Sequence, residues 1–321
     1  MKIVFHGANA NAFEPGFAGL LERPHDISAV SDAVEGASEQ KTFLDADVLI
    51  GIKLDATMPK PERLRLYHAP AAGTDGIDRQ RLPASATLCN CFGHENAIAE
   101  YVIAALLTRY IPLAAADRDL HQGQWTFWPG RPNTLRQEMG DSTVGLLGFG
   151  HIGKAIAARA KAFGMRVTVA NRSPVPASPL VDKSFSLEAL PAFMASADAI
   201  VVSLPMLPEL RGIVGVGALA AMRPDAVIIN VGRGPVIDEA ALYDALKERR
   251  IGGAVIDTWY AYPTDANPTP HPSRLPFHEL GNVIMTPHMS GWTGGMIRRR
   301  QQTMADNINR LQRGDPLVNV V

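Results

Sequence analysis

The chain has 321 residues, of which 46% are hydrophobic and 20% are charged. This composition is typical of a soluble globular protein and argues against disorder, and the length favours two domains over one. Lys and Arg (31) nearly balance Asp and Glu (32), so no whole-protein field would attract nucleic acid or an anionic membrane. A small-molecule substrate is therefore the better expectation.

Targeting and redox signals point to the cytoplasm. No segment approaches the roughly 20 apolar residues of a membrane helix, and the N-terminal apolar run is too short and mixed for a secretory signal. Cys89 and Cys91 are spaced i and i+2 rather than as a C-x-x-C redox or metal motif. We expect two buried reduced thiols, a reducing compartment and no metal site.

The first third of the chain alternates short apolar runs with amphipathic segments. This alternation predicts crossover connections and a parallel sheet. Helical patterns are expected between several of the strands, as at 15–23 and 59–65. The expected strands lie near residues 2–7, 26–31, 47–52, 63–70 and 86–92.

A long helical stretch over residues 95–125 follows, and Pro112 is expected to kink or split it. The next segment, 126–141, is rich in turn formers and tryptophan, which predicts a loop packed on another part of the structure. The basic runs 247–250 and 298–300 are interpreted as solvated charge at helix ends or faces.

A second and more regular α/β series begins at Thr143. Its apolar runs are nearly continuous, as in strands buried on both faces. A helix is expected at 238–250, where acidic residues come first and basic residues last. The expected strands lie within 143–150, 165–172, 198–205, 226–234, 253–259 and 282–288.

The fold class that follows is α/β, with two Rossmann-like or flavodoxin-like parallel-sheet domains and an interdomain cleft. Residues 1–100 and 290–321 are expected to form one domain, and residues 101–289 the other. The C-terminal segment would be a helix that returns to the first domain.

Gly148-x-Gly150-x-x-Gly153 directly follows an expected strand and opens an expected helix. Gly148 permits a tight turn, Gly150 lets the backbone approach a pyrophosphate, and Gly153 lets helix and strand pack closely. The phosphates would lie on the N-terminal amides of the helix, next to His151 and Ile152. The pattern in this context predicts a dinucleotide site.

The end of the second strand of this unit bears on the choice of cofactor. An acidic residue there would bind the ribose 2′-hydroxyl of NAD, but the sequence has Asn171, Arg172 and Ser173. A guanidinium beside a hydroxyl suits a 2′-phosphate better. We expect a preference for NADP over NAD, unless Arg172 is only a solvated turn residue and selectivity is loose.

Six motifs run in order along nearly the whole chain: APAAGTDGID (69–78), GLLGFGHIG (145–153), VVSLPMLPELRGIV (201–214), INVGRGPVIDEAAL (229–242), GGAVIDTW (252–259) and TPHMSGWT (286–293). Together they resemble the D-isomer-specific 2-hydroxyacid dehydrogenases, and among them glyoxylate/hydroxypyruvate reductase-like members. The resemblance implies an NAD(P)-dependent enzyme that reduces a small 2-oxo acid to a D-2-hydroxy acid, with residues 1–100 and 290–321 as the substrate (catalytic) domain and residues 101–289 as the dinucleotide-binding domain.

The resemblance assigns Arg233 to binding and polarising the 2-oxo acid, which suits the planar fork of a guanidinium. It assigns His288 to acid/base catalysis, since reducing a ketone needs a proton near the working pH. Asp257 would orient the nicotinamide carboxamide. The other implied contacts are Ala72, Gly73, Thr74 and Asn96 with the substrate, and Leu204, Pro205, Val231, Gly232, Ser290 and Gly291 with the cofactor. Helix packing or capping is an equally good explanation of Asn96.

One position departs from the family pattern. The glutamate that pairs with the histidine commonly stands five residues after the aspartate, and here that place is Tyr262. A carboxylate would raise the pKa of His288 and fix its tautomer, whereas a phenol orients the ring but carries no charge near neutral pH.

Three interpretations stay open at this point. The first is a 2-oxo acid reductase whose relay uses Tyr262, or Asp265 from the same loop. The second is formate-dehydrogenase-like oxidation, which needs no proton on oxygen. The third is a catalytically weak nucleotide-sensing binding protein. The resemblance also implies a homodimer, with residues 124–132 either at the interface, reaching toward a partner's cleft, or packed on their own domain.

Overall fold

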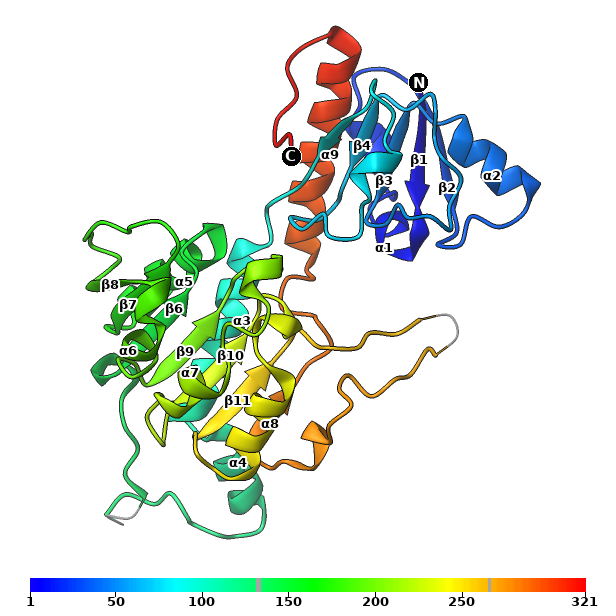
Figure 1. The fold of residues 1–321 in the computed structure, drawn as a ribbon. Helices are drawn as coiled ribbons and strands as arrows, with labels where there is room; N and C mark the ends of the chain where they lie inside the picture. Colours follow the sequence, from blue (N-terminus) through cyan, green and yellow to red (C-terminus); the bar gives the residue numbers. More distant parts are fainter. Residues whose placement is uncertain (131–133, 265–266) are drawn as a thin grey trace. The chain divides into compact units, whose positions relative to one another are not determined.

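The computed structural model describes residues 1–130, 134–264 and 267–321 (Figure 1). The chain divides into two units: unit 1 is Met1–Gly93 with Thr293–Val321, and unit 2 is His94–Trp292. The divisions lie close to the expected boundaries near residues 100 and 290. The first one precedes residue 100 because a single helix runs through that position and packs within unit 2.

Within the described residues, unit 1 has one parallel sheet with the strand order β2-β1-β3-β4-β5. All five expected strands are present. They are β1 (Lys2–His6), β2 (Asp26–Val30), β3 (Val48–Gly51), β4 (Leu66–His68) and β5 (Thr87–Cys89).

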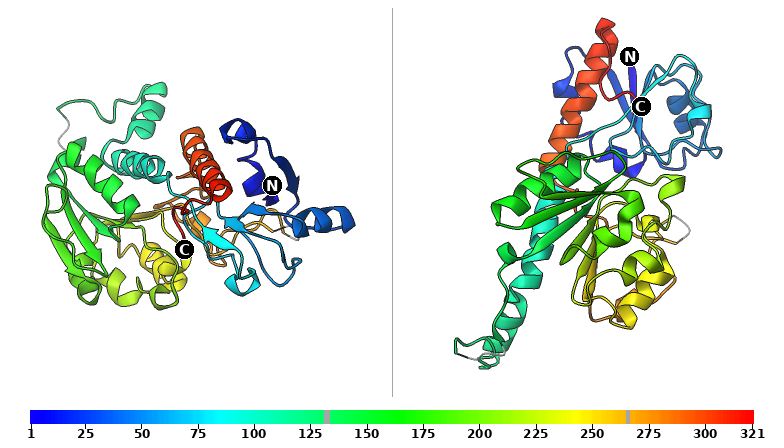
Figure 2. Two further views of the ribbon diagram at one scale, coloured as in Figure 1. Left: turned by 90° about the horizontal axis from the view of Figure 1, so that it is seen from above. Right: turned by 60° about the vertical axis from the view of Figure 1, so that its left-hand side comes forward.

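Helices cover both faces of this sheet, which explains its continuous apolar runs. Ile3 and Phe5 of β1 pack toward α9, whereas Val4 between them packs with Phe43 of α2. Figure 2 shows α9 along one face of the sheet, so the C-terminal helix does return to the first domain as expected. The helices of unit 1 are α1 (Gly7–Asn11), α2 (Ala37–Leu44) and α9 (Gly294–Arg313).

Within the part of the chain described, unit 2 has a parallel sheet with the strand order β12-β11-β10-β9-β6-β7-β8. The chain therefore leaves β6 toward β7 on one side and crosses to β9 on the other. The strands are β6 (Thr143–Leu147), β7 (Arg166–Asn171), β8 (Lys183–Ser186), β9 (Ala199–Val202), β10 (Val227–Asn230), β11 (Gly253–Ile256) and β12 (Val283–Met285).

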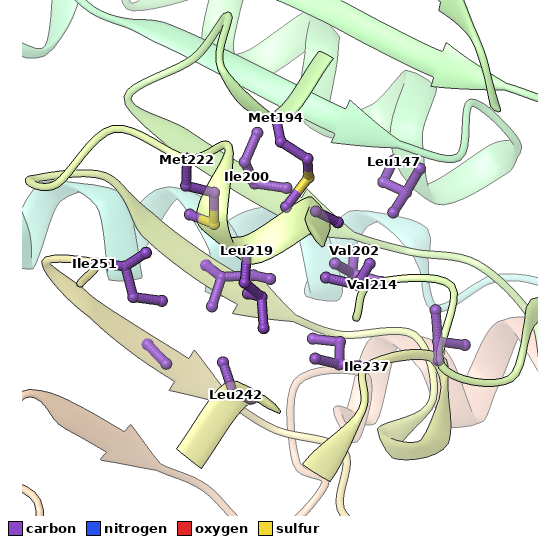
Figure 3. Packing of buried hydrophobic residues seen from close by; sticks show 14 of the residues in the cluster. Leu147, Met194, Ile200, Val202, Val214, Leu219, Met222, Ile237, Leu242 and Ile251 are labelled. Atoms are coloured by element: carbon purple, nitrogen blue, oxygen red, sulfur yellow. The ribbon is translucent and has the colours of Figure 1, made fainter. Parts of the chain in front are cut away.

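Two apolar layers enclose this sheet. On one face, Ile200 and Val202 of β9 pack with residues of α6, α7 and α8 (Figure 3). On the other face, Val201 packs with α3 and α5. The helices of unit 2 are α3 (Glu95–Tyr110), α4 (Leu113–His121), α5 (His151–Ala162), α6 (Leu190–Met194), α7 (Val216–Ala220) and α8 (Glu239–Lys247).

Pro112 separates α3 from α4 as expected, and the two helices are bent by 50° at the break. Among the described residues no single helix is long and apolar enough to span a membrane, although this bent pair reaches that length together. In α3, Val102 and Leu106 are fully buried in the core of unit 2.

Several expectations from the sequence were wrong. Residues 59–65 form no helix, since Pro59 and Pro61 remove amide donors and restrict the residue before each. Residues 15–23 hold only a 3₁₀ turn, Phe17–Leu20. The edge strand β8 was missed because Phe185 is its only strongly apolar residue. At the opposite edge, β12 is only partly buried.

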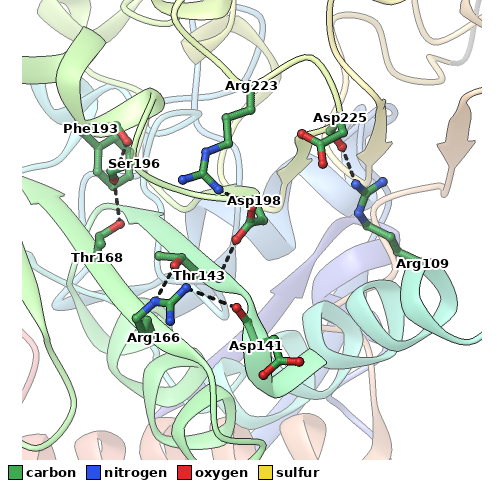
Figure 4. A network of polar contacts seen from close by, with 10 residues as sticks. All are labelled: Arg109, Asp141, Thr143, Arg166, Thr168, Phe193, Ser196, Asp198, Arg223 and Asp225. Carbon is green, nitrogen blue, oxygen red and sulfur yellow. Dashed lines mark hydrogen bonds and ion pairs between the residues drawn. The ribbon is translucent and has the colours of Figure 1, made fainter. Parts of the chain in front are cut away.

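The amino ends of the strands in unit 2 carry a polar network (Figure 4). Asp198 accepts a hydrogen bond of 2.7 Å from the Thr143 amide and forms an ion pair with Arg223. Arg109 of α3 donates to the Asp225 carbonyl just before β10. This network ties α3 and the loops to the sheet.

Candidate active site

The glycine-rich turn after β6 has the backbone that a dinucleotide requires. Gly148 has φ +99°, which L side chains rarely adopt, and a Cβ on Gly153 would lie 2.5 Å from the Gly148 carbonyl oxygen. A Cβ at Gly150, the N-cap of α5, would meet no atom within 4 Å. The open helix terminus and the close backbone approach fit a bound pyrophosphate.

The end of β7 is tied to this turn. Asn171 accepts a hydrogen bond from the Phe149 amide (3.3 Å) and donates to the Ser173 carbonyl (3.0 Å). Its amide group thus braces the turn, while Arg172 and Ser173 are exposed beside it. An exposed cation and hydroxyl at this strand end fit a 2′-phosphate.

Arg233 lies in a braced turn after β10. Asn230 accepts from the Gly232 amide (3.1 Å) and donates to the Arg233 carbonyl (3.2 Å). A Cβ on Gly232 would lie 2.6 Å from the Leu204 carbonyl oxygen, and one on Gly234 would lie 2.2 Å from that of Trp259. The turn is packed between two neighbouring loops, and only glycine leaves enough space on either side of Arg233.

Asp257, at the end of β11, is fully buried. Its carboxylate accepts hydrogen bonds from the Thr286 hydroxyl (2.6 Å) and from the amides of Met289 (2.9 Å) and Ser290 (3.0 Å). Between these donors His288 has φ +56°, an uncommon conformation for a non-glycine residue. The aspartate thus holds the segment that carries His288 in a strained conformation.

Tyr262 contacts His288 directly. Its hydroxyl lies 3.0 Å from His288 Nδ1 and accepts a hydrogen bond from the Trp259 amide at 3.1 Å. Desolvation lowers the pKa of His288 and the Arg233 cation acts in the same direction, whereas Asp257 opposes both. Desolvation also raises the pKa of Tyr262, so the phenol is neutral beside the ring. Asp265, the other candidate partner, lies outside the described residues.

The remaining expected cofactor contacts lie at the carboxyl ends of the strands in unit 2. Leu204 and Pro205 follow β9, Val231 and Gly232 follow β10, and Ser290 and Gly291 follow β12. Asn96 is exposed in the first turn of α3, where its Oδ1 accepts from Arg159 of α5 (3.2 Å). Asn96 therefore links two helices of unit 2.

Ala72, Gly73 and Thr74 lie in unit 1, in the loop after β4. Asn90 donates to the Ala72 carbonyl (2.8 Å), and Arg300 of α9 donates to the carbonyl of Pro70 at 2.8 Å. Arg300 is only 8% exposed, so its interpretation as solvated charge was wrong. Helix α9 packs against the loop after β4 and buries the Arg300 side chain there.

The two cysteines are free and buried, as expected. Burial raises the pKa of Cys89 to about 11 and that of Cys91 to about 12. Both thiols therefore stay protonated and unreactive near neutral pH. Among the described residues, no group of three or more His, Cys, Asp or Glu side chains forms a candidate metal site.

Residues 103–290 match the model of the NAD binding domain of D-isomer specific 2-hydroxyacid dehydrogenases. The chain belongs to this family. The matched segment contains both the glycine-rich turn and the Arg233, Asp257, Tyr262 and His288 cluster.

Individual family members are similar over most of the chain. D-3-phosphoglycerate dehydrogenase of Methanocaldococcus jannaschii is 32% identical over 317 residues, covering 94% of this chain but 56% of that protein. The chain thus spans about half the length of this and other curated D-3-phosphoglycerate dehydrogenases that it matches.

Two solved structures are similar to this chain over nearly the whole length of both partners. A D-isomer specific 2-hydroxyacid dehydrogenase family protein from Aeromonas salmonicida is 26% identical, with a TM-score of 0.82, over 100% of this chain and 98% of that one. An acyclic imino acid reductase in complex with NADPH and D-Arg is also 26% identical, with a TM-score of 0.80, over 100% of both chains.

Four residues that support the site were not found from the sequence: Asn230, Trp259, Thr286 and Tyr101, whose hydroxyl lies 2.7 Å from that of Thr286. Asn230 could have been found, because it is a polar residue at the end of an otherwise apolar strand, two residues before Gly232, and buried polar groups need hydrogen-bond partners. The other three act through contacts between distant segments, such as Trp259 Nε1 to the Thr286 carbonyl (2.8 Å), and carry no local signal.

Proposed function

We propose that this protein is an NAD(P)H-dependent reductase of small 2-oxo acids that forms D-2-hydroxy acids. The observation that carries the proposal is the Tyr262–His288 hydrogen bond of 3.0 Å, in the same unit as Arg233 and the glycine-rich turn. This arrangement keeps a proton-donating histidine oriented although the family's usual carboxylate is replaced. The NAD-binding domain of the family supports the cofactor class.

In the proposed reaction the glycine-rich turn would hold a reduced nicotinamide cofactor, which would supply the hydride for the carbonyl carbon. Arg233 binds the 2-oxo acid and polarises its carbonyl oxygen. His288, protonated at both ring nitrogens, donates the Nε2 proton to that oxygen and keeps its Nδ1–H on the Tyr262 hydroxyl. Because desolvation lowers the pKa of His288, reduction would decline with rising pH at lower pH than with an ordinary histidine.

The remaining assignments are part of the same proposal. Backbone amides at Gly73 and Thr74, next to Ala72, bind the substrate carboxylate, and Asn96 contributes from α3. Arg172 and Ser173 bind a 2′-phosphate, so NADPH is preferred over NADH. Comparing KM for the two cofactors tests this preference, and a clear advantage for NADH would contradict it.

The central test follows NADPH absorbance with glyoxylate, hydroxypyruvate and phenylpyruvate, and then identifies the product enantiomer. Arg233→Ala is expected to abolish turnover and leave NADPH binding intact. Arg223→Ala is a matched control, since Arg223 pairs with Asp198 at the other end of the strands. Loss of NADPH binding in Arg233→Ala would show that Arg233 has another role.

Two other functions are distinguished in the same assays. Formate oxidation with NAD would indicate formate-dehydrogenase-like chemistry. Cofactor binding without turnover of any acid would indicate a nucleotide-sensing protein. Either result would contradict the proposed reductase.

A second candidate is reduction of 2-imino acids. The neutral Tyr262 beside His288 favours it, because a protonated imine already carries its proton. Hydride would add to the iminium carbon, the C=N π electrons would move to nitrogen, and an amine would form without a proton from His288. The similarity to the imino acid reductase in complex with NADPH and D-Arg supports this candidate.

Supplying pyruvate with and without methylamine separates the two candidates, because the amine and the oxo acid form the imine in solution. Faster NADPH oxidation and an N-methyl amino acid product would support imine reduction. An unchanged rate with lactate as the sole product would exclude it.

We also propose a cytoplasmic homodimer. The exposed aromatic side chains Trp125, Phe127 and Trp128 support an interface on residues 124–130, while Arg131 and Pro132 lie outside the described residues. Light scattering of wild type and Trp128→Ala tests it, and a monomeric wild type would contradict it.

A further inference from the structure

Tyr101 connects α3 to the segment that carries His288. It lies in the second turn of α3, half-buried against the core of unit 2. Its hydroxyl is 2.7 Å from the Thr286 hydroxyl, two residues before His288 in the sequence. This contact joins segments 185 residues apart.

Chemistry determines the direction of these hydrogen bonds. The Asp257 carboxylate can only accept, so the Thr286 hydroxyl donates its hydrogen to Asp257 Oδ1 at 2.6 Å. Thr286 has no second hydroxyl hydrogen, and therefore Tyr101 must donate to Thr286. The result is a directed chain in which the Tyr101 hydroxyl orients the Thr286 hydroxyl toward the Asp257 carboxylate.

Asp257 is the anion that acts on His288. It raises the pKa of His288 against desolvation and the Arg233 cation, while the Tyr262 hydroxyl contacts Nδ1. Its bonds to the Met289 and Ser290 amides also hold His288 at φ +56°. Anything that orients Thr286 therefore affects both the position and the charge state of His288.

We propose that Tyr101 is a positioning residue for His288, acting through Thr286 and Asp257. The proposal rests on the proposed role of His288 as proton donor. Without the Tyr101 hydroxyl, Thr286 loses the bond that orients it, and the 286–290 segment is held less firmly on Asp257.

The test compares Tyr101→Phe with Tyr110→Phe, the same substitution at the end of the same helix. The pKa of His288 is measured by NMR titration of its ring protons, assigned with a His288→Asn variant. Tyr101→Phe is expected to weaken proton binding at His288 about threefold and to lower kcat for reduction about fivefold. The pH at which reduction declines should also fall, whereas KM for NADPH should stay within about twofold of the wild-type value. Tyr110→Phe should change none of these.

Thr286→Ser and Thr286→Val provide a second pair if Tyr101→Phe folds poorly. Serine keeps the hydroxyl and should leave the pKa of His288 near that of the wild type, whereas valine should lower it at least as much as Tyr101→Phe does. Circular dichroism and thermal unfolding verify that each variant is folded.

A folded Tyr101→Phe with an unchanged His288 pKa and pH profile would overturn the inference and leave Tyr101 a structural residue. If the wild type reduced no 2-oxo acid but the pKa shift were observed, the proposed function would fail while the positioning role stood. An equal change in Tyr110→Phe would also overturn the inference.

Discussion

The two ends of the strands in unit 2 are built differently. At the amino ends, polar side chains are paired with one another and with backbone groups, as Asp198 is with Thr143 and Arg223. At the carboxyl ends, a glycine-rich turn leads directly into the N-terminus of α5, and His288 is held in the left-handed region. The paired polar groups at the amino ends stabilise the fold, whereas the carboxyl ends include a strained backbone conformation at His288, in the proposed catalytic site.

The parallel sheet accounts for this difference. Its carboxyl ends lead into helix N-termini and into the crevice where strand order reverses, which is where open α/β sheets bind ligands. Variants at the carboxyl ends should therefore alter activity more than stability, and variants at the amino ends should do the reverse.

After Arg233→Ala, the largest loss of turnover is expected for His288→Asn. Asparagine tolerates the left-handed region but cannot donate a proton as imidazolium does, so kcat for reduction should fall about 10²–10⁴-fold. Thermal unfolding should be nearly unchanged. His278→Asn, an exposed histidine of unit 2, is the control. Retention of most activity would show that His288 is not the proton donor.

The sheet of unit 1 differs from that of unit 2, because a histidine at a carboxyl strand end, His68 in β4, is fully buried and affects stability. Burial lowers the pKa of His68 to about 4 from its ordinary 6.5. The unfolded chain thus binds the proton more tightly, and stability is retained above pH 6.5 and lost as pH falls toward 4. At pH 5 this costs about 2 kcal/mol.

Chemical denaturation at pH 7 and pH 5 measures this loss. In His68→Gln, where an amide oxygen can accept from Asn307, the difference between the two pH values should shrink. An equal pH dependence in both proteins would show that other groups dominate.

Asp198→Ala should lower stability by about 1–3 kcal/mol, since it leaves the Thr143 amide and Arg223 without their acceptor. Asp198→Asn keeps an acceptor and should lose less. Turnover of the folded protein should stay within about twofold in both. A lower kcat at unchanged stability would contradict the idea that the amino ends of the strands serve stability and the carboxyl ends serve activity.

Tyr262→Phe should lower kcat much less than His288→Asn does, by about fivefold. Protonated His288 donates from Nδ1 to the Tyr262 hydroxyl, so losing that acceptor should lower the pKa of His288 further. Reduction would then decline at lower pH, with KM less affected. A pH–rate profile identical to that of the wild type would show that Tyr262 does not support the proton donor.

Much of the fold was predictable because its signals are local. Continuous apolar runs identified β6, β9, β10 and β11, whose residues are buried on both faces of the sheet. The edge strand β8 was not predicted, because it is largely exposed and therefore has few apolar residues. In the candidate site, Tyr262 was recognised by its distance from Asp257 along the chain.

The sequence by itself determined the fold class, the glycine-rich turn and the substitution of a tyrosine for the usual glutamate, because each depends on neighbouring residues. Only the tertiary structure decided that Tyr262 contacts His288, that Asp257 holds the 286–290 segment, and that Arg300 is buried. These contacts join segments distant along the chain. Their geometry is set by packing across the sheets, which no local pattern encodes.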